Sequence, residues 1–168
     1  GPGVSVREIL RWPDPRLATP CDRVEDVAAI ETLVTDMFET MYDAPGRGLA
    51  APQVGVLQRV FVMDAGWKEG DMTPVVCINP RIVSVSSETA RGPEGCLSIP
   101  GVTAEVTRAT TVTMAYTDLT GTAQERTFEG AEAIIAQHEY DHLDGLVHFD
   151  RLSPDDARAL RDEYDAQR

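Results

Sequence analysis

Hydrophobic residues near the start of the chain recur at helical spacing. Between about Asp26 and Tyr42 they stand three or four positions apart, with acids and threonines between them. They are Ile30, Leu33, Val34, Met37, Phe38 and Met41. Residues at this spacing share one face of a helix, so the pattern predicts an amphipathic α-helix that buries them. Residues 4–23 are predicted to be irregular. In Trp12-Pro13-Asp14-Pro15, each residue before a proline avoids helical backbone angles, which forces an extended or turning path.

Between residues 59 and 129, short apolar runs and alternating patterns predict strands. They are Arg59–Met63, Val75–Ile78, Arg81–Glu88, Ala104–Arg108, Thr110–Thr117 and Thr122–Glu129. Within Thr110–Thr117, residues Val112, Met114 and Tyr116 share one face, since side chains alternate along a strand. Two stretches rich in glycine and proline, 44–53 and 91–101, are predicted as loops.

Two further helices are predicted after residue 130. The first runs from about Ala131 to Leu143 and ends before Gly145, which adopts a positive φ readily. The second starts after Ser153, a favourable N-cap residue, and reaches about Ala166. The order of helix, strands, helix and helix predicts an α+β fold. We expect a mainly antiparallel sheet packed around a central helix, with N-terminal and C-terminal helices.

The composition limits the classes of protein to consider. The chain has 168 residues, 42% of them hydrophobic, which predicts one domain over residues 4–168. Gly1-Pro2-Gly3 is interpreted as the remnant of a cleaved tag. The net charge of −13 argues against direct DNA binding and against an anionic membrane surface. No apolar run approaches the ~20 residues of a membrane span, and no secretory signal pattern is seen.

The three cysteines are few and odd in number, which does not suggest a disulfide framework. Cys21 and Cys77 are interpreted as buried structural thiols. The set favours a reducing compartment with one functional thiolate, and therefore a cytoplasmic location.

The segment Gln137–Gly145 contains the pattern His138-Glu139-x-x-His142. Residues four apart lie on one face of a helix, so the two imidazoles can bind the same divalent metal ion. Glu139 leaves the helix about 100° away from His138, which suits a carboxylate that moves protons without being a ligand. The central helix of the α+β fold is therefore predicted to be a metal-binding helix.

A catalytic site of this type needs a third protein ligand, and the sequence offers two candidates. With His148 as the third ligand, the spacing His138-Glu139-x-x-His142-x-x-Gly145-x-x-His148 matches metzincin peptidases. Metzincins also place a methionine downstream of that histidine, whereas every methionine here precedes residue 115. The other candidate is Cys96, in the centre of the second glycine-rich stretch.

Three motifs together resemble the peptide deformylase family. They are Gly46-Arg47-Gly48-Leu49-Ala50-Ala51-Pro52-Gln53, Glu94-Gly95-Cys96-Leu97-Ser98 and Gln137-His138-Glu139-Tyr140-Asp141-His142. Their order and spacing also match, and the resemblance covers nearly the whole chain from about Val6. It implies a hydrolase that removes the N-formyl group from the starting methionine of nascent polypeptides and releases formate. His148 is then interpreted as a surface or packing residue.

The resemblance also implies a set of roles for individual residues. Cys96, His138 and His142 would hold one divalent metal ion, Fe(II) in the cell, with Zn(II) or Ni(II) possible in purified protein. Glu139 would take a proton from water and pass it to the leaving amine. The Gln53 side-chain amide and the Leu97 N–H would donate hydrogen bonds to the oxyanion. The backbone of Gly48 would align the substrate chain.

The substrate methionine needs an apolar pocket, for which Leu97, Ile134 and Ile135 are the candidates; core packing is the alternative for the isoleucines. Arg47, Glu94 and Gly95 are the other expected substrate contacts. The family usually has an aliphatic residue in place of Arg47, and many bacterial members have an arginine in place of Thr103. Arg47 either extends into solvent or contacts the peptide backbone or an acidic group. The resemblance also implies that the substrates are nascent chains met near the ribosome exit, and the sequence leaves the oligomeric state open.

Overall fold

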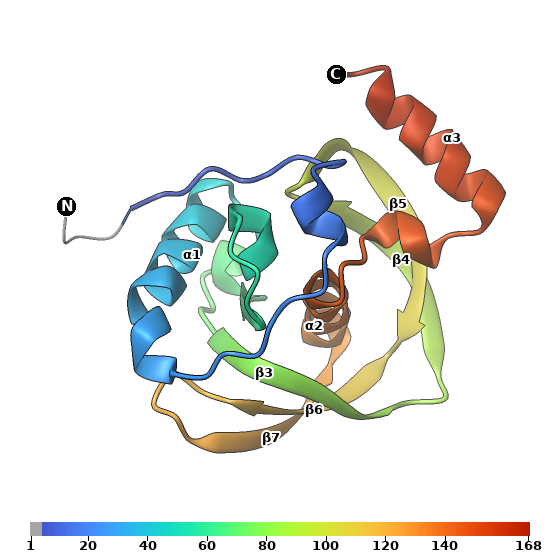
Figure 1. Cartoon of the computed structure of the whole chain (residues 1–168). Coiled ribbons are helices and arrows are strands. Elements are labelled where there is room, and N and C mark those ends of the chain that lie inside the picture. The colour runs from blue at the N-terminus through green and yellow to red at the C-terminus, as the bar shows by residue number, and fades with distance from the viewer. Residues whose placement is uncertain (1–4) are drawn as a thin grey trace.

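The computed structural model describes residues 5–168, and within them the chain forms three α-helices and seven strands (Figure 1). The helices are α1 (Glu31–Asp43), α2 (Gly130–Leu143) and α3 (Pro154–Asp165). The strands are β1 (Gly48–Ala50), β2 (Val60–Asp64), β3 (Pro74–Val85), β4 (Thr89–Cys96), β5 (Ile99–Ala109), β6 (Thr111–Thr117) and β7 (Ala123–Glu129). The interpretation of Gly1–Gly3 as a tag remnant lies outside the described residues.

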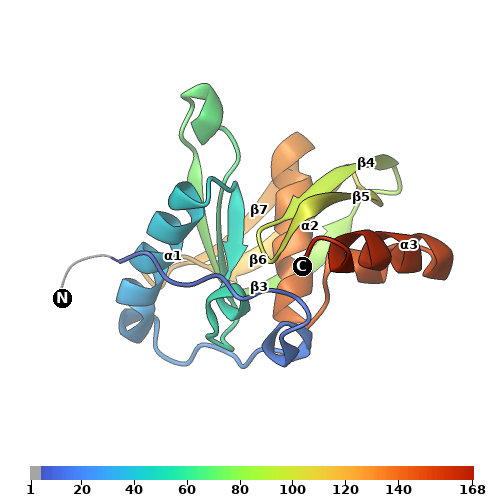
Figure 2. The ribbon, with the colours of Figure 1, turned by 90° about the horizontal axis from the view of Figure 1, so that it is seen from above.

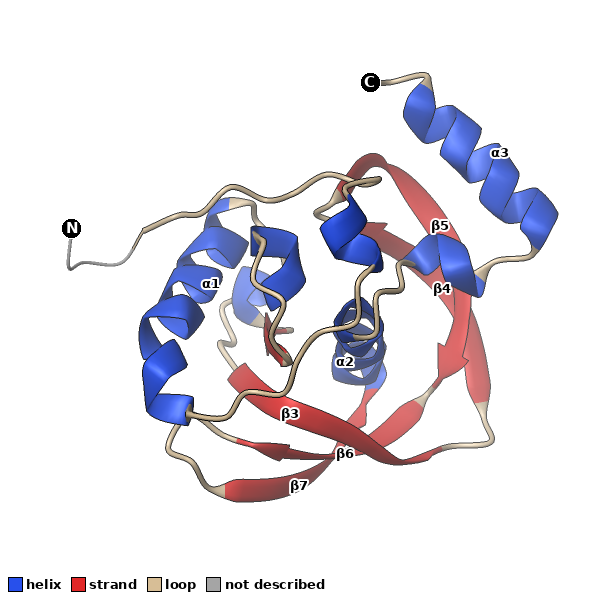
Figure 3. Ribbon diagram, viewed as in Figure 1, coloured by secondary structure: helices blue, strands red, loops and turns tan. Residues whose placement is uncertain are grey.

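All strand pairs in the two sheets are antiparallel. Five strands form one sheet in the order β1-β2-β3-β6-β7, and β4 and β5 form a separate hairpin. Figure 3 shows the strands on two sides of α2, which lies end-on in the middle of the molecule. Helix α1 covers another side, against β1 and β2. The predicted α+β fold with a central helix is therefore confirmed.

The burial pattern explains the central position of α2. Small and apolar side chains on one of its faces are fully buried, and they join the core formed by β2, β3, β6 and β7. They are Ala133, Ala136 and Leu143. The predicted stripe of α1 lies in a second apolar cluster, with Met37 and Met41 fully buried. The first turn of the predicted N-terminal helix, Val27–Ile30, is a 3₁₀ turn capped by Asp26.

The end of α2 and the start of α3 have the stop and cap residues that the sequence predicts. Gly145 has φ +78°, and a Cβ there would lie 2.8 Å from the carbonyl carbon of Ala18, so glycine is required for two reasons. The Ser153 hydroxyl accepts a hydrogen bond from the Asp156 N–H at 3.2 Å, which caps α3. Helix α3 packs against β5, and Figure 2 shows it beside the β4–β5 hairpin.

Three sequence predictions of local structure were wrong. Val75–Ile78 and Arg81–Glu88 are not separate strands, because β3 runs through Asn79 and Pro80 with a register shift. Asn79 takes φ +50°, and its side-chain amide bonds to the backbone of Val24 at 2.8 and 2.9 Å, which holds this irregularity in place. The long-range bonds to Val24 could not be predicted from local pattern.

The two stretches predicted as loops also contain regular structure. Residues 91–101 form the tip of the β4–β5 hairpin, where Pro93 is tolerated because β4 is an edge strand. Residues 44–53 include strand β1 and a 3₁₀ turn at Ala51–Val54. Cys21 and Cys77 are both buried free thiols, as predicted. Among residues 5–168, no helix has the length and apolar content needed to cross a membrane.

Candidate metal centre

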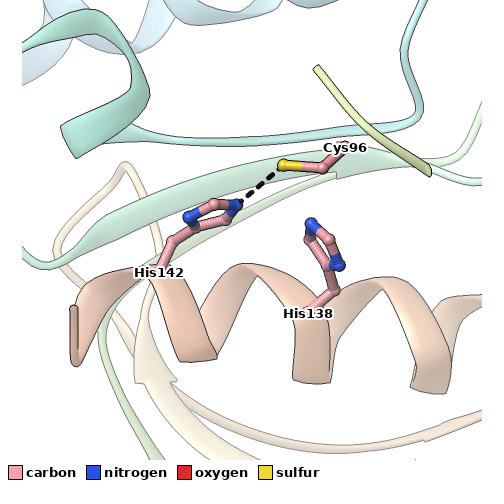
Figure 4. Close-up of side chains that lie close together, drawn as sticks. All are labelled: Cys96, His138 and His142. Carbon is pink, nitrogen blue, oxygen red and sulfur yellow. Dashed lines mark hydrogen bonds between the residues drawn. The ribbon is translucent and has the colours of Figure 1, made fainter. Parts of the chain in front are cut away.

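Helix α2 directs His138 and His142 toward the same point. Their ring centroids lie 5.0 Å apart, and both residues are buried. The third group comes from the end of β4, where the Cys96 sulfur lies 3.5 Å from His142 Nε2 (Figure 4). One ligand atom from each of the three residues lies within 4.8 Å of the other two. Within the described part of the chain, the structure thus brings together the predicted helix pair and the predicted cysteine.

The spacing and chemistry of this triad fit a transition metal. Metal–sulfur and metal–nitrogen bonds of ~2.3 and ~2.1 Å at a tetrahedral angle put sulfur and nitrogen roughly 3.5 Å apart. The Cys96–His142 separation has this value. One thiolate with two imidazoles suits borderline divalent ions such as zinc and iron. The residues therefore fit the metal ion that the family resemblance implies.

The local electrostatics also favour a bound cation. Burial lowers the pKa of His138, but the neighbouring Cys96 and Glu94 side chains outweigh burial and raise this pKa well above its usual value. Burial and the charge of His138 lower the pKa of His142 well below its usual value, so this ring stays neutral. Negative charge on Glu94 thus lies beside His138, and His142 offers a neutral imidazole as a further ligand.

A chain of ion pairs, buried except at Arg151, supports His138 on the side away from the triad. Glu94 contacts His138 Nδ1 at 3.0 Å, and Arg108 donates to both Glu94 oxygens at 2.6 and 2.9 Å. Arg108 also donates to Asp141 at 2.9 Å, and Arg151 donates to the same carboxylate at 2.6 and 3.0 Å. Burial raises the pKa of Glu94, but the bonds from His138 and Arg108 outweigh it and lower this pKa to about 2. A charged Glu94 orients His138 so that Nε2 is left for the triad.

Glu139 is 4% exposed and occupies the floor of the cavity beside the triad. Burial raises its pKa to about 7, which suits a group that both accepts and donates a proton near neutral pH. Its Oε1 has no hydrogen-bond partner among residues 5–168. A Cβ at Gly48 would lie 2.6 Å from Glu139 Oε2 and 2.7 Å from Ile135, so glycine allows β1 to pass this close to α2.

The Gln53 side chain is held with its amide nitrogen toward the site. Its Oε1 accepts a hydrogen bond from the Ala50 N–H at 2.9 Å. Its Nε2 donates to the Ser98 hydroxyl at 3.1 Å and lies 3.8 Å from the Cys96 sulfur. Because the oxygen is engaged by a backbone donor, the nitrogen must face the metal centre.

A cavity of about 890 Å³ opens onto this centre. It is lined by all the residues that the sequence proposed for catalysis and substrate binding, and by Cys96 and His138 of the triad. They are Arg47, Gly48, Gln53, Glu94, Gly95, Leu97, Ile134, Ile135 and Glu139. Both carboxylate oxygens of Glu94 accept hydrogen bonds from Arg108, and one also contacts His138. Its side chain is therefore held against these two residues, and a contact between Glu94 and the substrate stays a prediction.

His148 lies outside the triad and is not on the surface. It is 1% exposed, with its ring centroid 6.1 Å from that of His138, and neither ring nitrogen has a partner among the described residues. Of the two earlier interpretations, a packing role is confirmed. Among the described residues, the group that could hold a metal ion contains Cys96 and not His148 in the third place, which counts against the metzincin arrangement.

The sequence analysis missed Arg108, Asp141 and Ser98 as supporting residues. A signal for Arg108 was present in the alternation of β5. Buried residues occupy every second position of the strand, and Arg108 continues this series although it is charged. A charge on the buried face of a strand requires buried partners, so this position indicated a network.

The chain matches the family model described as polypeptide deformylase over residues 6–158. A peptide deformylase of Xylella fastidiosa (strain 9a5c) is 46% identical over 169 residues, which are 98% of each chain. One from Afipia carboxidovorans is 47% identical over 151 residues, covering 89% of this chain and 88% of the relative.

Solved structures show the same fold. The crystal structure of a peptide deformylase from Legionella pneumophila has a TM-score of 0.88 and 42% identity, covering 96% of this chain and 94% of its own. That of the Ehrlichia chaffeensis protein in complex with actinonin has a TM-score of 0.91 and 38% identity, covering 98% of both chains.

Proposed function

The chain belongs to the peptide deformylase family, and from this premise we propose how its own residues perform the reaction. It is a metal-dependent hydrolase that removes the N-formyl group from the N-terminal methionine of newly made polypeptides and releases formate. The observation that carries the assignment of the site is the meeting of Cys96, His138 and His142 in one buried group. We take residues 4–168 as a single catalytic domain.

Cys96, His138 and His142 are the ligands of one divalent metal ion in this proposal. When bound, such an ion lowers the pKa of water and stabilises negative charge on a carbonyl oxygen. The ligand set suits zinc and iron alike. From the family resemblance we expect Fe(II) in the cell, with Zn(II) or Ni(II) possible in purified protein. Glu94 holds His138 in the orientation that leaves Nε2 toward the other two ligands, on the basis of the 3.0 Å contact.

Glu139 is the general base and then the general acid. Its carboxylate accepts a proton from water as the formyl carbon is attacked, and it returns the proton to the nitrogen of methionine as the C–N bond breaks. Its burial beside Gly48 supports this role, because the site of attack must lie between α2 and the strand that holds the substrate.

Two donors stabilise the oxyanion that forms on the formyl group. The Gln53 Nε2 is one, since its orientation is fixed by the Ala50 N–H and Ser98. The Leu97 N–H, at the turn of the β4–β5 hairpin, is the other. Donors set in place before the reaction stabilise the transition state without reorganisation.

The substrate chain aligns along β1. This strand is at the edge of the five-stranded sheet, so its outer side can bond an extended peptide through Gly48. The methionine side chain then enters the apolar part of the cavity beside Leu97, Ile134 and Ile135. Arg47 and Gly95 flank this path. Because a formyl carbon carries only hydrogen, the narrow space near Gly48 excludes bulkier acyl groups.

We place this activity in the cytoplasm, near the ribosome exit where nascent chains emerge. The buried free thiols Cys21 and Cys77 are compatible with a reducing compartment.

The proposed roles are tested by formate release from formyl-Met-Ala-Ser, with Fe(II) protein prepared anaerobically and its metal content measured alongside. Glu139→Gln is expected to lower kcat by roughly 10²- to 10⁴-fold while one metal ion per chain is retained, because general acid–base catalysis contributes about this much. A Glu139→Gln protein with full activity would contradict the role of Glu139. Absence of formate release from the unaltered, metal-loaded protein would contradict the function itself.

A further inference from the structure

The exposed charged residues that line the active-site cavity are all positive within residues 5–168. They are Arg11, Arg47, Lys68 and Arg91, which we call the cationic rim. The acidic residues along the same cavity, Glu94 and Glu139, are buried and belong to the metal centre. A molecule that enters the cavity therefore meets positive charge before it meets the catalytic groups.

The charge of the cationic rim is opposite in sign to the net charge of the chain. Acidic residues outnumber lysine and arginine by 28 to 15, and Lys68 is the only lysine. A cavity mouth that carries four cations and no exposed acid on its described lining thus has the opposite sign to the protein as a whole. A local field of this kind raises the concentration of oppositely charged ligands and steers them into the site.

The rim residues stand on both walls of the cavity. Arg47 precedes Gly48 of β1, and Lys68 lies on the neighbouring 3₁₀ turn, which is held to this wall by the Trp67 Nε1 bond to the Gly46 carbonyl at 2.8 Å. Arg91 belongs to β4 on the facing wall. In Figure 2 the turn (green) and the β4–β5 hairpin lie on either side of one end of α2. An extended peptide along β1 runs between these charges.

The charge on Arg47 is available to a ligand. Its guanidinium contacts Glu69 at 2.9 Å, but the two side chains are 41% and 62% exposed. Exposed ion pairs of this kind contribute little to stability, so a carboxylate of a bound peptide can replace Glu69 at little cost.

We infer that the cationic rim selects formyl-methionine peptides with acidic side chains in the residues that follow methionine. The inference rests on the proposed function, because it requires the peptide to lie along β1 with its formyl group at the metal centre. The rim residues line the cavity itself, so the ligand they contact is the substrate that occupies the cavity and not a macromolecule docked elsewhere.

The test compares kcat/KM for formyl-Met-Glu-Glu, formyl-Met-Gln-Gln and formyl-Met-Lys-Lys with the metal-loaded enzyme. At low salt the Glu-Glu peptide is expected to exceed the Lys-Lys peptide by about tenfold, in the lower range of electrostatic steering. The ratio should fall toward one at high salt, because charges are screened over ~3 Å in 1 M salt. The double variant Arg47→Gln/Arg91→Gln should lose most of this ratio.

Arg81→Gln is the matched control. It removes an exposed arginine on β3 that does not line the cavity, and it should keep the unaltered ratio and salt dependence. Equal turnover of the three peptides at low salt would overturn the selectivity while leaving the deformylase function intact. No formate from any peptide would overturn both. Inhibition by a short single-stranded RNA, with a flat peptide ratio, would assign the rim to nucleic acid and also overturn the inference.

Discussion

The three histidines of the spacing His138-Glu139-x-x-His142-x-x-Gly145-x-x-His148 have different surroundings in the structure. His138 and His142 belong to the metal centre, whereas His148 lies outside it. His138 and His148 are both buried. His138 contacts Glu94 through Nδ1, and Glu94 is in turn held by Arg108. The His148 nitrogens have no partner in the described chain, and its ring packs against Phe149 at 4.9 Å between centroids. His142 also has an unpartnered Nδ1, but its Nε2 lies 3.5 Å from the Cys96 sulfur. The contacts of His138 with Glu94 and of His142 with Cys96 therefore distinguish these two rings from His148 where spacing does not.

The largest expected effect breaks the triad at its sulfur. Cys96→Ala should abolish stoichiometric metal binding and formate release, because two imidazoles without the thiolate leave the site one protein ligand short. His148→Ala is the control and should keep one metal ion per chain. Metal analysis after gel filtration, with formate release on the same samples, measures both. Loss of metal only in the His148 variant would favour the metzincin arrangement and contradict the comparison.

Removing the charge of Arg108, which bonds both Glu94 and Asp141, should destabilise the fold. Arg108→Met leaves Glu94 and Asp141 as buried carboxylates that lack one partner. Breaking a buried pair in this way costs about 3–5 kcal/mol of unfolding free energy. Urea unfolding of metal-free protein measures the change. Arg158→Met removes an exposed arginine of α3 and should change the unfolding free energy by less than ~0.5 kcal/mol. A similar small change in Arg108→Met would show that the network does not support the fold.

A smaller effect is expected when the contact behind His138 is weakened without changing its shape. Glu94→Gln keeps a hydrogen-bond acceptor near Nδ1 but removes the charge, and it should lower metal affinity by roughly 10- to 100-fold. Competition with a chromophoric chelator gives the dissociation constant. Glu88→Gln, an exposed position at the start of the hairpin, serves as the control. Unchanged affinity in Glu94→Gln would leave Glu94 with a purely structural role.

The smallest expected effect concerns the buried His148 ring, whose nitrogens have no partner among the described residues. His148→Phe should raise the unfolding free energy of metal-free protein by about 1 kcal/mol, because buried polar atoms without partners are removed. Metal content and formate release should be unaffected. His148→Gln keeps buried polar atoms at the position and should show no such gain. A loss of metal in His148→Phe would show that this ring takes part in the centre.

Much of the architecture could be predicted from periodicity. The buried stripe of α1 and the shared face of Val112 and Met114 follow from spacings of 3.6 and 2, which depend on local backbone geometry alone. Strand β4 could not be predicted in the same way as Ala104–Arg108 of β5, since the glycines and Pro93 of β4 are typical of loops. Pairing with β5 overrides that local preference, and pairing is a long-range contact.

The sequence by itself determined the spacing of His138 and His142, because a helix places residues four apart on one face whatever surrounds it. It also supplied the motifs that resemble one family of hydrolases. Tertiary packing brings Cys96 and not His148 to this pair, places Glu94 against His138, and gathers four cations along the cavity. The physical reason is that ligation, ion pairing and electrostatic fields depend on distances in space. Strand pairing and helix packing set these distances between residues far apart in the chain.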